Sequence, residues 1–146
     1  MNLLVINGPN LNMLGIREPD IYGKRDYAAL CEYIKHVCES EGITLELFQS
    51  NHEGAIIDCI QNAYGNGGFD AILINPAAYT HTSIAIMDVL KSVDIPAVEV
   101  HLTDISEREE FRRISYTALA CRKSFSGKGF ESYKDAILYI KQLTVE

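Results

Sequence analysis

The stretch Ala71-Ile72-Leu73-Ile74-Asn75-Pro76 decides the fold class, because four apolar residues run without interruption into a polar turn. A strand with one face in water alternates apolar and polar residues. A run that is apolar at every position is typical of a central strand in a parallel sheet, which helices cover on both faces. This stretch therefore predicts an α/β protein with Ala71–Ile74 in the middle of its sheet.

Strand patterns and helix patterns alternate along the whole chain on both sides of this stretch. We expect strands at residues 3–6, 43–48, 71–74 and 97–100, with a fifth within 118–125. We expect helices at about 26–42, 50–65, 80–93 and 132–143, with a short helix after residue 106. The alternation predicts one domain, residues 1–146, built on a flavodoxin-like, doubly wound sheet of five parallel strands with helices on both faces.

Start signals locate these helices more closely. Asp26 is expected to cap the first helix and Gly42 to end it. Two capping-box patterns, Ser50-Asn51-His52-Glu53 and Ser106-Glu107-Arg108-Glu109, are expected to open later helices. The helix between them is expected to take its cap from residues 80–82.

Composition limits the kinds of partner. The chain has 146 residues, 47 % of them hydrophobic, and a net charge of −7. An acidic chain lacks the basic footprint of nucleic-acid or anionic-membrane binding, so an anionic ligand would need locally concentrated cations. With no membrane-length apolar run and no signal-peptide pattern at the start, we expect a cytoplasmic protein. Its four cysteines form no C-x-x-C pair and are expected to be free thiols.

A long connection, about residues 8–25, separates the first strand from the first helix. Connections in compact α/β units are usually about 2–6 residues long, and much longer ones are often lids or binding loops. This one contains two prolines, three glycines, several apolar side chains, Arg17 and Tyr22. We interpret it as a lid over a site, and the alternative is an ordered Ω-loop packed on the surface.

Polar side chains follow each of the first four expected strands. Asn7 ends the first strand, Ser50-Asn51-His52 the second, and Asn75 opens a polar segment that reaches His81 after the third. Glu99-Val100-His101-Leu102-Thr103 ends the fourth. Ligands of open parallel sheets bind beyond the carboxyl ends of the strands, so these residues predict a small-molecule site at that edge.

Several kinds of chemistry are disfavoured. The sequence contains no Gly-rich dinucleotide motif, P-loop, Gly-x-Ser-x-Gly elbow or His-Glu-x-x-His pair. Asn7 and Asn75 stand where a response regulator needs acidic residues. His81 and His101 are possible zinc ligands, but no cluster of carboxylates accompanies them, so no metal is expected. No lysine stands at an apolar strand end, which disfavours a Schiff base.

The remaining residues suit acid–base chemistry without a cofactor. A free tyrosine has a pKa of about 10 and is a poor base at neutral pH, but a guanidinium such as that of Arg17 favours the phenolate of Tyr22. His101 suits protonation of a hydroxide leaving group. Glu99 either orients this imidazole or is a separate buried carboxylate with its own donors. Asn75 is a donor that can stabilise an enolate.

Five motifs together resemble the signatures of type II 3-dehydroquinate dehydratases, in the same order. They are Gly8-Pro9-Asn10-Leu11-Asn12, Gly15-Ile16-Arg17-Glu18-Pro19 with Ile21-Tyr22-Gly23, Gln49-Ser50-Asn51-His52-Glu53-Gly54, Ile74-Asn75-Pro76 with Tyr79-Thr80-His81, and Glu99-Val100-His101. The resemblance implies reversible anti loss of water from 3-dehydroquinate through an enolate, giving 3-dehydroshikimate in the shikimate pathway. It also implies that the reaction needs neither metal nor imine.

The resemblance also implies roles for individual residues. Tyr22 would abstract the proton next to the ketone, Arg17 would sustain its ionised form, and His101 would protonate the departing hydroxyl. Asn10 would position water or the enolate oxygen, and Glu99 would support the catalytic framework. The implied substrate-binding residues are Asn75, His81, Leu102, Thr103 and Arg112.

The family assembles as trimers joined into a dodecamer, in which the residue matching Asp88 reaches the site of a neighbouring subunit. Two departures from the family pattern stand out: Thr103-Asp104 replaces Ser-Asn, and residues 119–125 are more polar than usual. The rival interpretations are another lyase or an isomerase acting on a hydroxylated carboxylate, and a non-catalytic domain that keeps the binding pocket.

Overall fold

A computed structural model of the chain describes residues 1–16 and 25–145. Its five parallel strands are β1 (Asn2–Asn7), β2 (Thr44–Gln49), β3 (Ala71–Asn75), β4 (Ala97–Val100) and β5 (Ser124–Phe125). Their order across the sheet is β2-β1-β3-β4-β5, which is the flavodoxin-like order. The predicted fold class is therefore confirmed.

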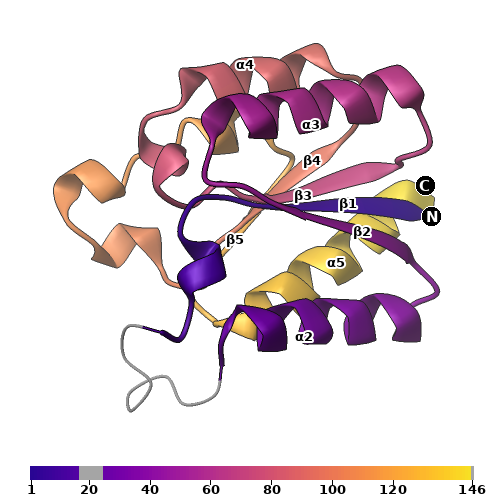
Figure 1. Cartoon of the computed structure of the whole chain (residues 1–146), viewed down its shortest axis with the longest axis horizontal. Helices are drawn as coiled ribbons and strands as arrows, with labels where there is room; N and C mark the ends of the chain where they lie inside the picture. The colour runs from indigo at the N-terminus through magenta and orange to yellow at the C-terminus, as the bar shows by residue number, and fades with distance from the viewer. Residues whose placement is uncertain (17–24, 146) are drawn as a thin grey trace.

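Helices cover both faces of this sheet. Figure 1 shows α2 (Tyr27–Ser40) and α5 (Phe130–Val145) below it, with α3 (Glu53–Asn66) and α4 (Ile84–Ser92) above it. Successive side chains of a strand point to opposite faces, so Leu3 and Val5 join one core cluster while Leu4 and Ile6 join the other. The uninterrupted apolar runs of β1 and β3 follow from this double burial.

Of the helix caps predicted for α2, α3 and α4, the first is confirmed and the other two are wrong. Asp26 caps α2, since its carboxylate accepts a hydrogen bond from the Ala29 amide at 2.8 Å. The prediction of a capping box at 50–53 is wrong, because the Ser50 hydroxyl accepts from the His52 amide and α3 begins only at Glu53. The cap of α4 is Ser83 rather than a residue of 80–82, which belong to a 3₁₀ segment and the turn that follows it.

The segment between β4 and β5 differs most from expectation. The predicted helix after residue 106 is replaced by two 3₁₀ turns, η3 (Ile105–Glu107) and η4 (Glu110–Arg112), because the Asp104 side chain takes both the amide and the hydroxyl of Ser106. A third turn, η5 (Thr117–Ala120), occupies the first part of the region expected to hold the fifth strand, and β5 has only two residues at the end of that region.

The two ends of the sheet carry different parts of the chain. Both chain termini lie at the amino ends of the strands (Figure 1), and the carboxyl ends carry the turns that follow β1, β3 and β4. Arg17 and Tyr22, the two residues expected on a lid, lie outside the described residues. Among the described helices, none is both long enough and apolar enough to span a bilayer.

Candidate active site

A cavity of about 290 Å³ lies at the carboxyl ends of β1, β3 and β4. Seven residues that the sequence analysis named line it: Asn10, Asn75, His81, His101, Leu102, Thr103 and Arg112. Its remaining walls come from Pro9, Leu11, Ala77, Ala78, Ile105 and Arg108. Turns far apart in the sequence meet here because all the strands point the same way.

The other named residues lie elsewhere. Glu99 is buried behind His101, with 1 % of its surface exposed. Asp88 is exposed in a groove between α3 and α4, and His52 is exposed; neither lines the cavity. Arg108 lines the cavity but was missed as a site residue, although its spacing of four from Arg112 is a signal that the two arginines lie near each other.

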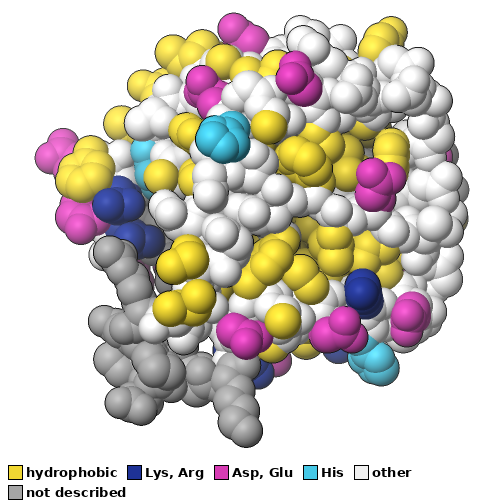
Figure 2. All heavy atoms as spheres, in the orientation of Figure 1, with side chains coloured by type: hydrophobic (Ala, Val, Ile, Leu, Met, Phe, Trp, Pro, Cys, Tyr) yellow, Lys and Arg dark blue, Asp and Glu magenta, His cyan; other side chains and the backbone are white. Residues whose placement is uncertain are grey.

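The cavity is locally cationic in an acidic protein. Its described lining includes two arginines and two histidines and no carboxylate. At the end of the molecule toward which the strands point, Figure 2 shows Lys and Arg side chains (dark blue) with acidic side chains (magenta) beside them. Positive charge concentrated in a concave site attracts anions, so this cavity suits a small anionic ligand.

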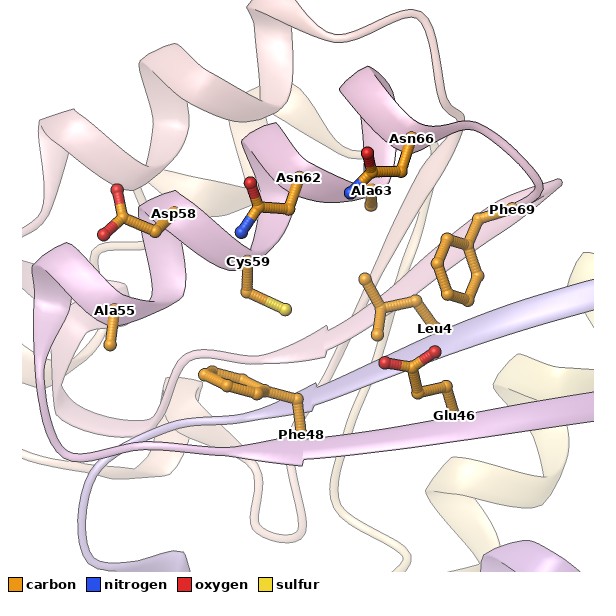
Figure 3. Close-up of a pocket in the computed structure, with 10 residues that line it drawn as sticks. All are labelled: Leu4, Glu46, Phe48, Ala55, Asp58, Cys59, Asn62, Ala63, Asn66 and Phe69. Atoms are coloured by element: carbon orange, nitrogen blue, oxygen red, sulfur yellow. The ribbon is translucent and has the colours of Figure 1, made fainter.

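A second hollow of about 520 Å³, lined by β2 and α3, has the opposite character. In Figure 3, Phe48 and Leu4 lie at its base, and the Glu46 and Asp58 carboxylates come from opposite sides. Its described lining contains no basic side chain, so the hollow is a poor site for an anion in spite of its size.

His101 is held against Glu99 in a nearly dry environment. The imidazole Nε2 is buried and lies 3.3 Å from Glu99 Oε2, although its N–H direction does not form an aligned hydrogen bond with that oxygen. Because Nε2 faces the carboxylate and His101 lines the cavity, Nδ1 is the ring nitrogen left for a ligand. The buried Glu99 carboxylate therefore lies close enough to limit how the imidazole can turn.

Glu99 also has hydrogen-bond donors of its own, apart from its contact with His101. Its carboxylate accepts hydrogen bonds from the hydroxyls of Ser115 (2.8 Å), Ser124 (2.9 Å) and Thr117. Burial raises the pKa of Glu99, but the contact with His101 and these hydroxyl donors outweigh burial and leave the pKa below its ordinary value. Glu99 is therefore a fixed negative charge at neutral pH.

Replacing Glu99 by glutamine is expected to lower the free energy of unfolding at pH 7 by about 2 kcal/mol, because buried hydroxyls and His101 lose a charged partner. The folded-state pKa of Glu99 lies below 4.5, so the contribution of its charge is complete above that pH and declines as the pH falls through the folded-state pKa. Urea unfolding at pH 7 and pH 3 measures the difference. If the difference in the free energy of unfolding between wild type and variant is the same at both pH values, the prediction is wrong. Glu39→Gln, at an exposed position of α2, is the control.

Hydrogen bonds orient two cavity-lining side chains, Asn75 at the end of β3 and His81 in the turn after it. His81 Nδ1 lies 2.7 Å from the carbonyl oxygen of Ile114, and a carbonyl only accepts, so Nδ1 carries the hydrogen and Nε2 is free to accept from a ligand. The Asn75 Oδ1 accepts from the Ala77 amide at 3.1 Å, and its Nδ2 donates to the hydroxyl of Tyr133 at 2.9 Å. Both side chains therefore present a defined hydrogen-bonding atom to the cavity.

The arginines keep donors available. Arg112 Nε lies 3.0 Å from the Glu109 carboxylate without forming an aligned hydrogen bond, and the terminal nitrogens of the guanidinium remain for an anion. Arg108 Nη1 lies 3.5 Å from the Thr103 hydroxyl, at the limit of a hydrogen bond. The planar guanidinium with paired donors is the side chain best suited to a carboxylate.

Gly8 allows the turns after β1 and β3 to approach closely. Its amide donates to the Asn75 carbonyl at 2.8 Å, and a Cβ at this position would lie 2.6 Å from the Pro76 carbonyl oxygen. A nonbonded carbon and oxygen do not come this close in proteins, so a side chain here would force the two turns apart. Asn10, in the turn after β1, and Asn75, at the end of β3, would then move relative to each other.

Gly8→Ala is expected to lower the free energy of unfolding by about 1–3 kcal/mol through overpacking and to reduce ligand affinity. Thermal unfolding and calorimetric binding measure the two effects. The matched control is Gly54→Ala in α3, where an added Cβ meets nothing within 4 Å and where helix propensity favours alanine. If Gly8→Ala and wild type have the same free energy of unfolding, the two turns can move apart without loss of stability and the prediction is wrong.

Among the described residues, no group of three or more His, Cys, Asp or Glu side chains is placed to hold a metal ion. The cavity itself offers an imidazole with a carboxylate behind it, two amides, a second imidazole and two guanidiniums. This set suits proton transfer on a small hydroxylated anion.

Known proteins share both the sequence and the fold. The family model for Dehydroquinase class II matches residues 1–141. The 3-dehydroquinate dehydratase of Clostridium acetobutylicum is 52 % identical over 143 residues, which cover 98 % of each chain. That of Caldicellulosiruptor bescii is 51 % identical over 141 residues, covering 97 % of each chain.

Solved structures agree with these sequence relatives. The type II dehydroquinase from Butyrivibrio crossotus is 54 % identical, with a TM-score of 0.91 and 97 % of each chain covered. A 3-dehydroquinate dehydratase-like protein from Bifidobacterium longum, 24 % identical with a TM-score of 0.72, shares the fold. By sequence along nearly its whole length and by structure, the chain belongs to the class II dehydroquinase family.

Proposed function

We propose that this chain is a hydro-lyase that catalyses reversible anti elimination of water from 3-dehydroquinate, giving 3-dehydroshikimate in the shikimate pathway. The relatives named above support the activity. The single observation that carries the chemistry is the cationic strand-end cavity, in which an imidazole backed by a buried carboxylate faces amide and guanidinium donors. Such a set supplies an acid, oriented donors and an anion clamp.

The substrate's carboxylate is the anion that the cavity would hold. Arg112 is its proposed partner, together with the backbone and side chain at Leu102 and Thr103. The proposal is supported by their shared position on the wall that follows β4 and by the absence of carboxylates from the described lining. Asn75 and His81 are proposed to bind the substrate's hydroxyls, with His81 Nε2 accepting a hydrogen bond.

The reaction breaks a C–H bond and a C–O bond in separate steps. Tyr22, as a phenolate sustained by Arg17, is proposed to take the proton next to the ketone, leaving an enolate. His101 then gives a proton to the hydroxyl, which departs as water while the enolate re-forms the ketone as part of a conjugated enone. Asn10 is proposed to position water or the enolate oxygen, and no metal, imine or cofactor takes part.

Glu99 is proposed to hold the His101 imidazole in the orientation that this second step needs. Support comes from the 3.3 Å separation of their side chains and from the three hydroxyls that hold the carboxylate in place.

We propose a cytoplasmic homododecamer of trimers in which Asp88 reaches a neighbouring subunit's site. Asp88 is exposed and lies in the groove between α3 and α4, away from the cavity of its own chain, which is compatible with a role across an interface. Light scattering of the purified protein tests the assembly, and a monomer at working concentration would exclude it.

Incubating the protein with 3-dehydroquinate and following the ultraviolet absorbance of the conjugated enone tests the activity. We expect absorbance to rise to an equilibrium level. Calorimetry on the same sample separates the rivals: binding without product would indicate a non-catalytic domain, and no binding would indicate an enzyme with another substrate. Borohydride trapping of a covalent adduct would contradict the imine-free mechanism.

A further inference from the structure

A chain of buried hydrogen bonds lies directly beneath the cavity and ends on Asn75. The Asn75 amide nitrogen donates to the Tyr133 hydroxyl at 2.9 Å, and that hydroxyl donates to Asn7 Oδ1 at 2.7 Å. Asn7 and Tyr133 have none of their surface exposed, and Asn75 has 3 %. Neither Asn7 nor Tyr133 lines the cavity, so a ligand there meets only Asn75.

The directions of these bonds leave little freedom. A phenol has one hydrogen, and Tyr133 gives it to Asn7, so its oxygen must accept from Asn75. The nitrogen of the Asn75 amide therefore faces Tyr133, while its oxygen faces the Ala77 amide. The second hydrogen on the Asn75 nitrogen remains unpaired among these partners. Asn75 can therefore donate this N–H to a ligand in the cavity.

We propose that Tyr133 is a positioning residue of the active site, which fixes the Asn75 amide so that it offers an N–H to the substrate. The proposal deepens the function proposed above and rests on it. Asn7 takes part as the acceptor that decides where the Tyr133 hydrogen points. The three residues come from β1, β3 and α5, so α5 acts on the site through the sheet without touching the ligand.

The identity of residue 133 matters because its surroundings are dry. Phenylalanine would fill the same space but give Asn75 no acceptor and Asn7 no donor, and the Ala77 amide alone would then hold the Asn75 side chain. Burial raises the pKa of Tyr133, with the Asn75 hydrogen bond opposing only in part, so the hydroxyl keeps its hydrogen at neutral pH. The polarity of the chain is thus constant over the working range.

The test is Tyr133→Phe, with Tyr139→Phe as the matched control. Tyr139 lies on the same helix and packs its ring against Phe125, 5.6 Å between centroids. We expect Tyr133→Phe to lower kcat/KM for 3-dehydroquinate roughly tenfold or more, by loss of an oriented donor, and Tyr139→Phe to leave it within about twofold. Circular dichroism and thermal unfolding establish that both variants are folded.

A double-mutant cycle separates positioning from a purely structural role. In an Asn75→Ala background, Tyr133→Phe is expected to change kcat/KM by less than about twofold, because the residue through which it acts is gone. The same fold loss in both backgrounds, or no loss from Tyr133→Phe alone, would overturn the proposal. Absence of turnover by the wild type would instead reject the proposed function.

Asn7→Ala gives an independent route if Tyr133→Phe does not fold. Without its acceptor, the Tyr133 hydrogen is free to turn toward Asn75, and the amide loses its fixed orientation. We expect kcat/KM to fall by a similar factor, and again not in the Asn75→Ala background. Unchanged kcat/KM in a folded Asn7→Ala variant would count against the proposal.

Discussion

Replacing His101 by alanine is expected to lower kcat by about 10²–10⁴-fold, the usual contribution of a general acid. Hydroxide is a poor leaving group, so without the imidazole the C–O bond must break with water as the only proton source. The fold is expected to survive, because Glu99 retains the hydroxyls of Ser115, Thr117 and Ser124 as donors.

Steady-state assay of enone formation measures this effect, and added imidazole is expected to restore part of kcat in His101→Ala. His36→Ala is the matched control, because His36 is an exposed histidine of α2 that does not line the cavity. A His101→Ala variant with wild-type kcat would remove this residue as the acid and leave Glu99 as a purely structural carboxylate.

The sheet was predictable because its signal is local and strong. Ala71–Ile74 is apolar at every position, and both faces of β3 are buried. Once the strands were known to be parallel, their polar ends had to meet at one edge. The sequence therefore placed Asn75, His81 and His101 at one site without any information on side-chain contacts, and all three line the cavity. Their catalytic and binding roles stay predictions.

The turns were not predictable in the same way, because tertiary hydrogen bonds decide them. Ser106 looked like a helix cap, but the preceding Asp104 takes its amide and hydroxyl. Ser115, before η5, and Thr117, its first residue, both donate to the buried Glu99. A capping-box pattern carries no information about such competing partners.

Parts of the site were invisible for a related reason. Tyr133 is 58 residues from Asn75 in the sequence, and only the packing of α5 under the sheet brings its hydroxyl to the amide. Arg108 was assigned to a helix start, whereas the two 3₁₀ turns bring it into the wall of the cavity together with Arg112. The topology predicts which residues at the strand ends lie together. It does not predict which residues of the 3₁₀ turns, or of the helix faces packed on the sheet, reach the site.

Replacing Tyr22 by phenylalanine is expected to remove nearly all turnover, with kcat lower by about 10³-fold or more, because no other residue is proposed to take the proton. Binding is expected to remain, because the proposed substrate partners are His81, Asn75 and Arg112, which line the described cavity. The affinity for 3-dehydroquinate, measured by calorimetry on the inactive variant, should therefore stay within a few-fold of the wild-type KM.

The control for Tyr22→Phe is Tyr79→Phe, which removes a phenol oxygen near the strand ends but outside the cavity lining. The Tyr79 hydroxyl donates to the Asn51 carbonyl at 2.8 Å, so its loss is expected to reduce stability slightly and to leave kcat unchanged. Loss of kcat with retained affinity in Tyr22→Phe alone identifies a group that acts on the reacting proton rather than on the bound substrate. Substantial turnover by Tyr22→Phe would mean that another group takes the proton, and the phenolate mechanism would have to be abandoned even if the cavity binds the proposed substrate.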